Sequence, residues 1–135
     1  MKNIFKWTAL LSCFVIMFCE SVSAQVNKNL EQVIQQDLNA LNSICPREVE
    51  KGVILNGARL LPQQTVEYSY TLKNFDSKAY NVTKFQNKII PALKDSLKAN
   101  SKMQALRDNQ VRLSFVFTDK NGSVIHKFKL LPNEY

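Results

Sequence analysis

The stretch that decides the fold is VRLSFVFTDKNGSVIHKFKLL, residues 111–131. Apolar and polar side chains alternate on both sides of the turn signal DKNG, which is the pattern of a β-hairpin with one buried face. We therefore expect two antiparallel strands here, at residues 111–118 and 123–131. The rest of the chain has to supply a partner for the apolar face of this hairpin.

Two registers are open to the hairpin. A three-residue loop with a glycine bulge places Phe115 opposite Lys127. A two-residue Asn-Gly turn places Phe115 opposite Phe128 and Phe117 opposite His126. Because a slip of one residue moves a whole face of side chains, the apolar pattern favours the second register.

A second hairpin is expected upstream, at residues 52–61 and 65–73, joined by residues 62–64. Its second strand alternates clearly, with apolar residues at every other position: Val66, Tyr68, Tyr70 and Leu72. Its first strand is less regular, and Gly57 there indicates a bulge.

Three helices are expected beside these strands. Residues 29–44 and 82–99 repeat apolar side chains at three- and four-residue steps, which is typical of amphipathic helices. Residues 102–108 form a short helical appendix, for which Ser101 and Gln104 resemble a capping box and Asn109 a left-handed exit. The predicted fold is therefore α+β, in the order helix, strand, strand, helix, short helix, strand, strand. We expect a four-stranded antiparallel sheet with the two amphipathic helices on one face and the other face open.

The beginning of the chain predicts export. Lys2 and Lys6 precede a short apolar run, and small residues follow at 21–24, as in a secretory signal peptide. The run is too short for a spanning helix, which needs about 20 apolar residues. We expect residues 1–24 to be removed, leaving residues 25–135 as one domain without a stable membrane span. Of the 135 residues, 18 are Lys or Arg and 11 are Asp or Glu, so the net charge is +7.

Several chemistries find little support in the sequence. After leader removal, Cys45 is the only cysteine and His126 is the only histidine, and no motif links them as nucleophile and base. One Cys and one His do not make a metal site, and the glycines form no phosphate-binding loop. We expect no cofactor, no metal and no enzymatic activity. Cys45 is either buried at a helix end or a free thiol open to mixed disulfides.

The basic surplus favours an anionic partner over nucleic acid, because no aromatic stacking residues lie among the lysines. The open sheet face is the candidate binding surface. Its predicted residues are Arg112, Ser114, Lys127 and Lys129 on the last hairpin, with Glu67, Ser69 and Thr71 nearby. The partner is expected to be another envelope protein or an anionic component of the envelope.

Four segments together resemble small secreted proteins of Gram-negative bacteria that have no established activity: residues 44–46, 52–55, 66–72 and 111–122. The layout also looks cystatin-like, which by analogy implies a binding or inhibitory module. The resemblance implies a periplasmic or secreted location. Two alternatives stay open: a thiol-dependent enzyme or redox protein using Cys45, and a self-associating structural component of the envelope. The oligomeric state is left open.

Overall fold

A computed structural model describes residues 30–135, so the predicted signal peptide at residues 1–24 lies outside the described residues. The elements are, in chain order, α2 (Leu30–Ser43), β1 (Arg47–Glu50), β2 (Val53–Leu61), β3 (Thr65–Leu72), α3 (Val82–Ala99), the 3-10 turn η2 (Ser101–Met103), α4 (Gln104–Asp108), β4 (Arg112–Thr118) and β5 (Val124–Leu130). Each helix and strand expected from the sequence is present, with ends that differ by a few residues at most.

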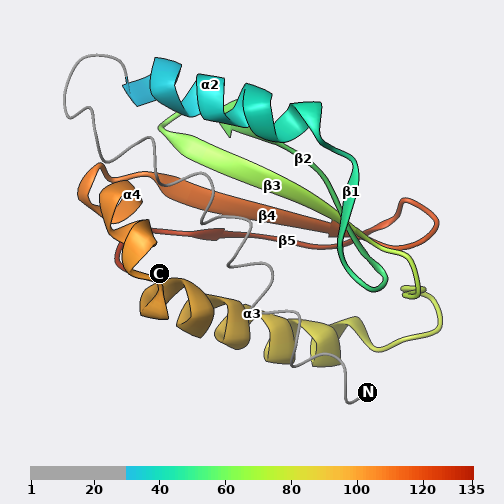
Figure 1. Cartoon of the computed structure of the whole chain (residues 1–135). Helices are drawn as coiled ribbons and strands as arrows, with labels where there is room; N and C mark the ends of the chain where they lie inside the picture. The colour runs from blue at the N-terminus through green and yellow to red at the C-terminus, as the bar shows by residue number, and fades with distance from the viewer. Residues whose placement is uncertain (1–29) are drawn as a thin grey trace.

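The sheet differs from the expected one. It has five strands in the order β1-β2-β3-β4-β5, and β3 and β4 run parallel while the other neighbours are antiparallel (Figure 1). The predicted four-stranded antiparallel sheet with two helices is therefore wrong. The part of the chain that the structure describes has a five-stranded mixed sheet with three α-helices.

Both differences have a physical reason. The strand that was not expected is β1, with the sequence REVE. Because three of its four residues are charged, it shows no alternation of apolar and polar side chains. It pairs only at the edge of the sheet, where charged residues are ordinary. The chain between β3 and β4 passes through α3, η2 and α4, and a long crossover of this kind permits parallel pairing.

The register favoured for the last hairpin is confirmed. Phe115 pairs with Phe128 and Phe117 pairs with His126, but the register then shifts so that Thr118 faces Val124. The hairpin therefore ends in a bulge instead of a plain two-residue turn. The bulge expected near Gly57 is also present, since the β2–β3 pairing shifts between Leu55 and Gly57.

The short helix begins and ends differently from the expectation. Residues 101–103 form the 3-10 turn, and Met103 precedes α4 without a side-chain cap, so the predicted capping box is not formed. The left-handed exit falls on Gln110, with φ of 57°, one residue after Asn109.

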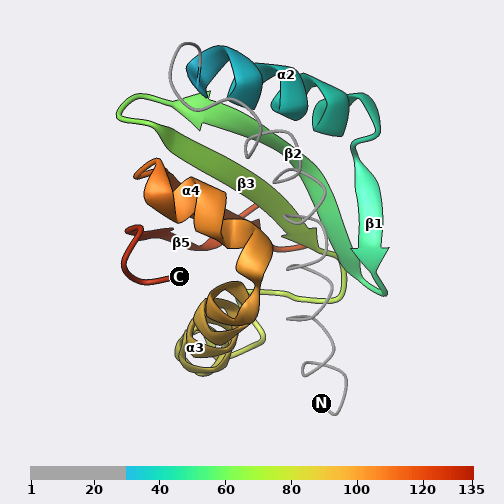
Figure 2. The same ribbon diagram turned by 60° about the vertical axis from the view of Figure 1, so that its left-hand side comes forward.

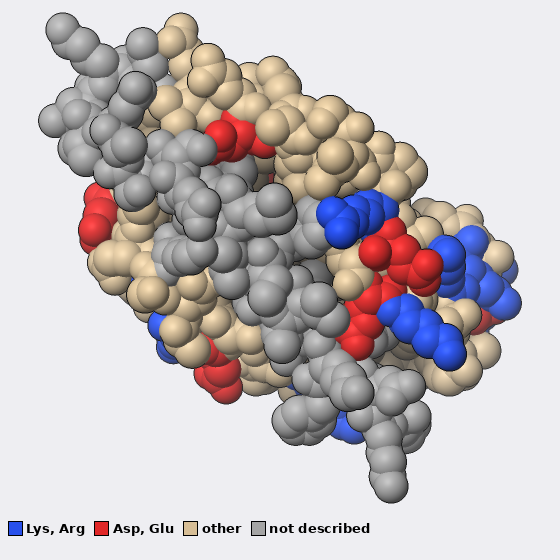
Figure 3. Space-filling model, viewed as in Figure 1, with Lys and Arg blue, Asp and Glu red and all other residues tan. Residues whose placement is uncertain are grey.

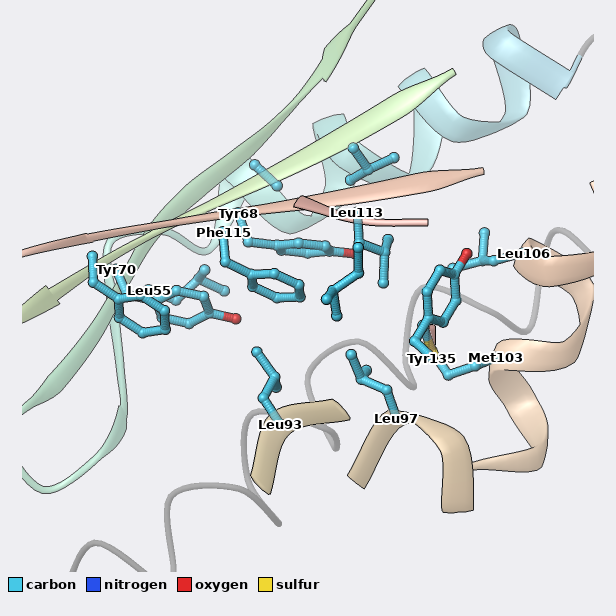
Figure 4. Close-up of a cluster of buried hydrophobic side chains, with 14 of the residues drawn as sticks. Leu55, Tyr68, Tyr70, Leu93, Leu97, Met103, Leu106, Leu113, Phe115 and Tyr135 are labelled. Carbon is cyan, nitrogen blue, oxygen red and sulfur yellow. The ribbon is translucent and has the colours of Figure 1, made fainter. Parts of the chain in front are cut away.

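The helices and the apolar face of the sheet share one core. α2, α3 and α4 lie on the same side of the curved sheet (Figure 2). Leu93 and Leu97 of α3 point toward the rings of Tyr68 and Phe115, which stack with centroids 5.7 Å apart (Figure 4). These side chains are fully buried or nearly so. Burial of aromatic rings against leucines is the main stabilising contribution to this layer.

Candidate functional site

The opposite face of strands β2 to β5 carries polar side chains. We call this surface the open face and define it by the alternation of the strands: residues 65, 67, 69 and 71 of β3, residues 112, 114, 116 and 118 of β4, residues 124, 127 and 129 of β5, and Arg59 of β2. All seven predicted binding residues lie on it, namely Arg112, Ser114, Lys127, Lys129, Glu67, Ser69 and Thr71. Their shared face follows from the strand register, while their role in binding stays a prediction.

The centre of the open face is a buried carboxylate. Glu67 is only 4% exposed. Its Oε1 accepts hydrogen bonds from Arg59 Nε at 2.9 Å and Nη2 at 2.8 Å. Its Oε2 accepts from Lys127 Nζ at 3.0 Å and Ser114 Oγ at 3.2 Å. We call these four residues the Glu67 cluster.

The cluster holds Glu67 ionised. Burial by itself would raise the pKa of Glu67, but the hydrogen bonds and charges of Lys127 and Arg59 outweigh this effect and hold the pKa below its usual range. The carboxylate is therefore charged at neutral pH, and both of its oxygens already have donors.

Burial separates the predicted residues into two groups. Ser114 is fully buried and Glu67 nearly so, which means that they support the surface and do not touch a partner directly. Lys127 and Lys129 are exposed, and Arg112 is half-buried with its Nη1 donating to Gln63 Oε1 at 2.7 Å. The cationic side chains therefore form the accessible part of the site.

A second polar network lies beside the cluster. Asn56 Nδ2 donates to Thr71 Oγ1 at 2.9 Å and is 3.5 Å from Ser69 Oγ. Thr71 Oγ1 is also 3.1 Å from Thr118 Oγ1 on the neighbouring strand. Ser69 and Thr71 are half-buried, so they line the surface without protruding from it.

An open pocket of about 450 Å³ joins the two networks. Its polar lining includes Arg59, Lys127 and Ser69, and its apolar lining includes Val116 and Val124. Ligand pockets commonly have volumes of about 300–1,000 Å³ and combine an apolar wall with a few polar groups. This hollow has both properties.

Sequence reasoning missed Arg59 and Asn56. The bulge before Gly57 changes which side chains of β2 face the helices, so Arg59 turns to the open face while Leu55 stays in the core. A signal was present, because the predicted loop at residues 62–64 places Arg59 opposite Glu67, and opposite charges across a hairpin often pair.

Two further ion pairs lie at one end of the molecule. Lys73 lies 3.6 Å from Glu48, and Lys120 lies 3.7 Å from Asp76. Figure 3 shows basic and acidic side chains intermixed at this end, where the β1–β2 turn meets the loops after β3 and β4. Opposite charges in close proximity leave little net field for a partner there.

A buried aspartate joins two of these loops. Asp119 accepts hydrogen bonds from the Ser77 hydroxyl at 2.7 Å and the Ser77 N–H at 3.1 Å, and from the N–H groups of Asn121 and Ser123. The Ser77 hydroxyl is the strongest of these influences, and together they outweigh burial and lower the pKa of Asp119 to about 2. Its role is structural, since all of its partners belong to the loops it connects.

The structure does not assemble a cysteine–histidine pair. Cys45 precedes β1 and His126 lies on β5, and these are the two outer strands of the sheet. His126 Nδ1 is 2.9 Å from Gln86 Nε2, and its ring stacks on Phe128. Cys45 is a half-buried free thiol whose pKa is raised by burial, against an opposing effect of Arg47. Cys45 is thus neither fully buried nor fully exposed, and its reactivity toward mixed disulfides stays a prediction.

Within residues 30–135, no three His, Cys, Asp or Glu side chains lie close enough together to hold a metal ion. In the same part of the chain, no helix has the length and apolar character needed to cross a bilayer.

Two solved structures have a similar fold. A presumed secreted protein from Pseudomonas aeruginosa matches with a TM-score of 0.59 at 15% identity, over 73% of this chain and 86% of its own. The type II secretion system pilotin AspS from Vibrio cholerae matches with the same TM-score and identity, over 79% of this chain and 93% of its own. At this identity the likeness shows the fold alone.

These neighbours agree with the resemblance to secreted proteins of Gram-negative bacteria, whereas the cystatin-like layout is not shown by them and stays a prediction. None of the curated proteins matches the chain. A family model does match, over residues 29–126, which is well over half of the chain. The protein therefore belongs to the family described as Domain of unknown function (DUF8479).

Proposed function

We propose that this protein is a non-enzymatic domain of the bacterial envelope or the secreted fraction, and that it binds another envelope protein through the open face. The observation that carries the proposal is the division of the sheet. Helices α2, α3 and α4 lie on one side, and the other side presents exposed Lys127 and Lys129 around a buried, fully paired carboxylate.

The comparisons support the location and the class of partner. One neighbour is described as a presumed secreted protein, and the other as the pilotin of a type II secretion system. Because fold likeness does not establish function, the partner has to be sought experimentally. An interaction surface centred on Lys and Arg with polar neighbours fits a reversible protein contact, which owes its specificity to charge complementarity.

Capture from envelope extract tests the proposal. The tagged, exported protein is incubated with solubilised envelope proteins, and bound proteins are identified by mass spectrometry. We expect the double variant Lys127→Ala, Lys129→Ala to lose the specific partner. Its melting temperature should fall, because Glu67 Oε2 loses the Lys127 donor, so circular dichroism checks that the variant stays folded. The matched control is Lys84→Ala, Lys88→Ala, which removes the same charge from exposed positions on α3.

Each outcome has a defined meaning. Loss of the partner in both double variants indicates attraction by net charge alone and contradicts a site on the open face. Retention in both also contradicts it. Recovery of a second copy of this chain, with a matching dimer in light scattering, would favour the self-associating alternative over a heterologous partner.

A further inference from the structure

The Glu67 cluster has more donors than it uses. Glu67 is the acceptor for Arg59, Lys127 and Ser114, and both of its oxygens are occupied. Arg59 carries five N–H donors and uses Nε and Nη2, and Lys127 carries three and uses Nζ toward one oxygen. Two cations face one anion, so the cluster has one unit of surplus positive charge. The hydrogen-bonding groups of the cluster that remain available are therefore N–H donors of Arg59 and Lys127.

The donors that remain are accessible. The side chain of Arg59 is 69% exposed and that of Lys127 is 48% exposed, although the carboxylate between them is buried. Both cations line the pocket of about 450 Å³. A cationic ligand would have to break existing ion pairs to reach Glu67, whereas an anionic ligand can add to the two cations without displacing it.

Apolar side chains line the pocket beside the cations. Val116 is half-buried and pairs across the strands with Lys127, and Val124, on the same strand as Lys127, is 62% exposed. An occupant that uses the whole pocket therefore combines an acidic group with neighbouring aliphatic carbon.

From this geometry we infer that the pocket binds an acidic polypeptide segment, with an Asp or Glu carboxylate held by Arg59 and Lys127 and a neighbouring aliphatic side chain packed on Val116 and Val124. The inference rests on the proposed function and specifies the chemistry of the partner. A hollow with an apolar wall favours a peptide over a membrane surface, for which a flat basic face would suffice.

Peptide titration tests the inference directly. The probe is a short peptide, blocked at both ends, that contains a Val-Glu-Val core, and the comparison peptide has Val-Gln-Val in the same frame. Binding to the 15N-labelled exported protein is followed by NMR chemical shifts. We expect the acidic peptide to shift the amides around Arg59, Val124 and Lys127, and the neutral peptide to bind more weakly. Sodium acetate, inorganic phosphate and phosphatidylglycerol vesicles are run as separate arms.

Three variants give a pattern that a merely structural cluster would not produce. Arg59→Gln and Lys127→Gln should each weaken peptide binding by about two- to fivefold, as expected for the loss of one exposed charge contact. Glu67→Gln should tighten it by a similar factor, because the internal competitor for both cations is removed. Lys88→Gln on α3 is the matched control and should leave the affinity unchanged. Circular dichroism checks that each variant is folded.

The outcomes separate this inference from the proposed function. Weaker binding in Glu67→Gln, or equal affinity for the two peptides, would overturn the acidic-segment inference even where envelope capture succeeds. Preferential binding to the vesicles would overturn it in favour of anionic lipid. Specific peptide binding without any captured envelope protein would support the pocket chemistry and count against the proposed partner.

Discussion

Replacing Tyr70 by phenylalanine is expected to stabilise the protein. The Tyr70 side chain is fully buried, and its ring stacks on Phe117 with centroids 5.4 Å apart. Among the residues that the structure describes, its hydroxyl has no hydrogen-bond partner. The variant keeps the ring and removes only this oxygen.

The expected gain is about 0.5–2 kcal/mol in the free energy of unfolding. Burying a hydroxyl without a hydrogen bond costs about 1–3 kcal/mol in mutational data, and this penalty disappears in the variant. A void the size of one oxygen atom remains, and a methyl-sized cavity costs about 1 kcal/mol. For a domain of this length, each kcal/mol corresponds to a melting-temperature shift of about 3–5 °C.

Urea denaturation of the variant and of a matched control measures the effect. The control is Tyr135→Phe, because Tyr135 is also buried but donates from its hydroxyl to the Val111 carbonyl at 2.6 Å. It should lose about 1 kcal/mol, since the carbonyl is left without its donor. The two substitutions delete the same atom and should act in opposite directions. A loss of stability in Tyr70→Phe equal to that in the control would refute the reasoning.

Three further predictions concern Asp119 and Cys45. The pKa of Asp119 is lowered to about 2, so its contribution to stability is present above its unfolded pKa near 4 and is lost as the pH falls from about 4 to 2. Melting curves between pH 6 and pH 2 should therefore show a smaller acid loss for Asp119→Asn than for the parent protein, and parallel curves would contradict this. Burial raises the pKa of Cys45, so thiol labelling at pH 8 should be slower in the folded protein than in urea. Cys45→Ser should leave partner capture intact; loss of capture would favour the thiol-dependent alternative.

The sequence predicted the local structure well where side chains alternate strongly. The pairing of Phe115 with Phe128 follows from the apolar pattern alone, because the other register would place a lysine in the core. The order of strands could not be predicted in the same way. β1 has one apolar side chain, Val49, among three charged residues, so it shows no alternation. The parallel pairing of β3 with β4 depends on how the crossover through α3 packs, which no local pattern encodes.

The sequence allowed us to predict which side of the sheet the candidate residues share, but not how deeply each of them is buried. Alternation places the seven candidate residues on one side of the sheet. The burial of Ser114 and Glu67 depends on Arg59 and Lys127 folding over them, and on a bulge that turns Arg59 to that side. Tertiary packing therefore determines which polar residues are buried beneath the surface and which are accessible to a partner.

The composition of the Glu67 cluster itself argues for binding. Long Lys and Arg side chains can cover the central strands with their aliphatic stems. Apolar residues of similar size would do the same without the cost of desolvating a carboxylate, and such replacements of ion pairs are often neutral or stabilising. A purely structural requirement therefore does not explain why Glu67 is held between Arg59 and Lys127. An acidic partner does explain it. Both cations are needed to hold the partner's carboxylate, and Glu67 compensates one of their two charges while the pocket is empty.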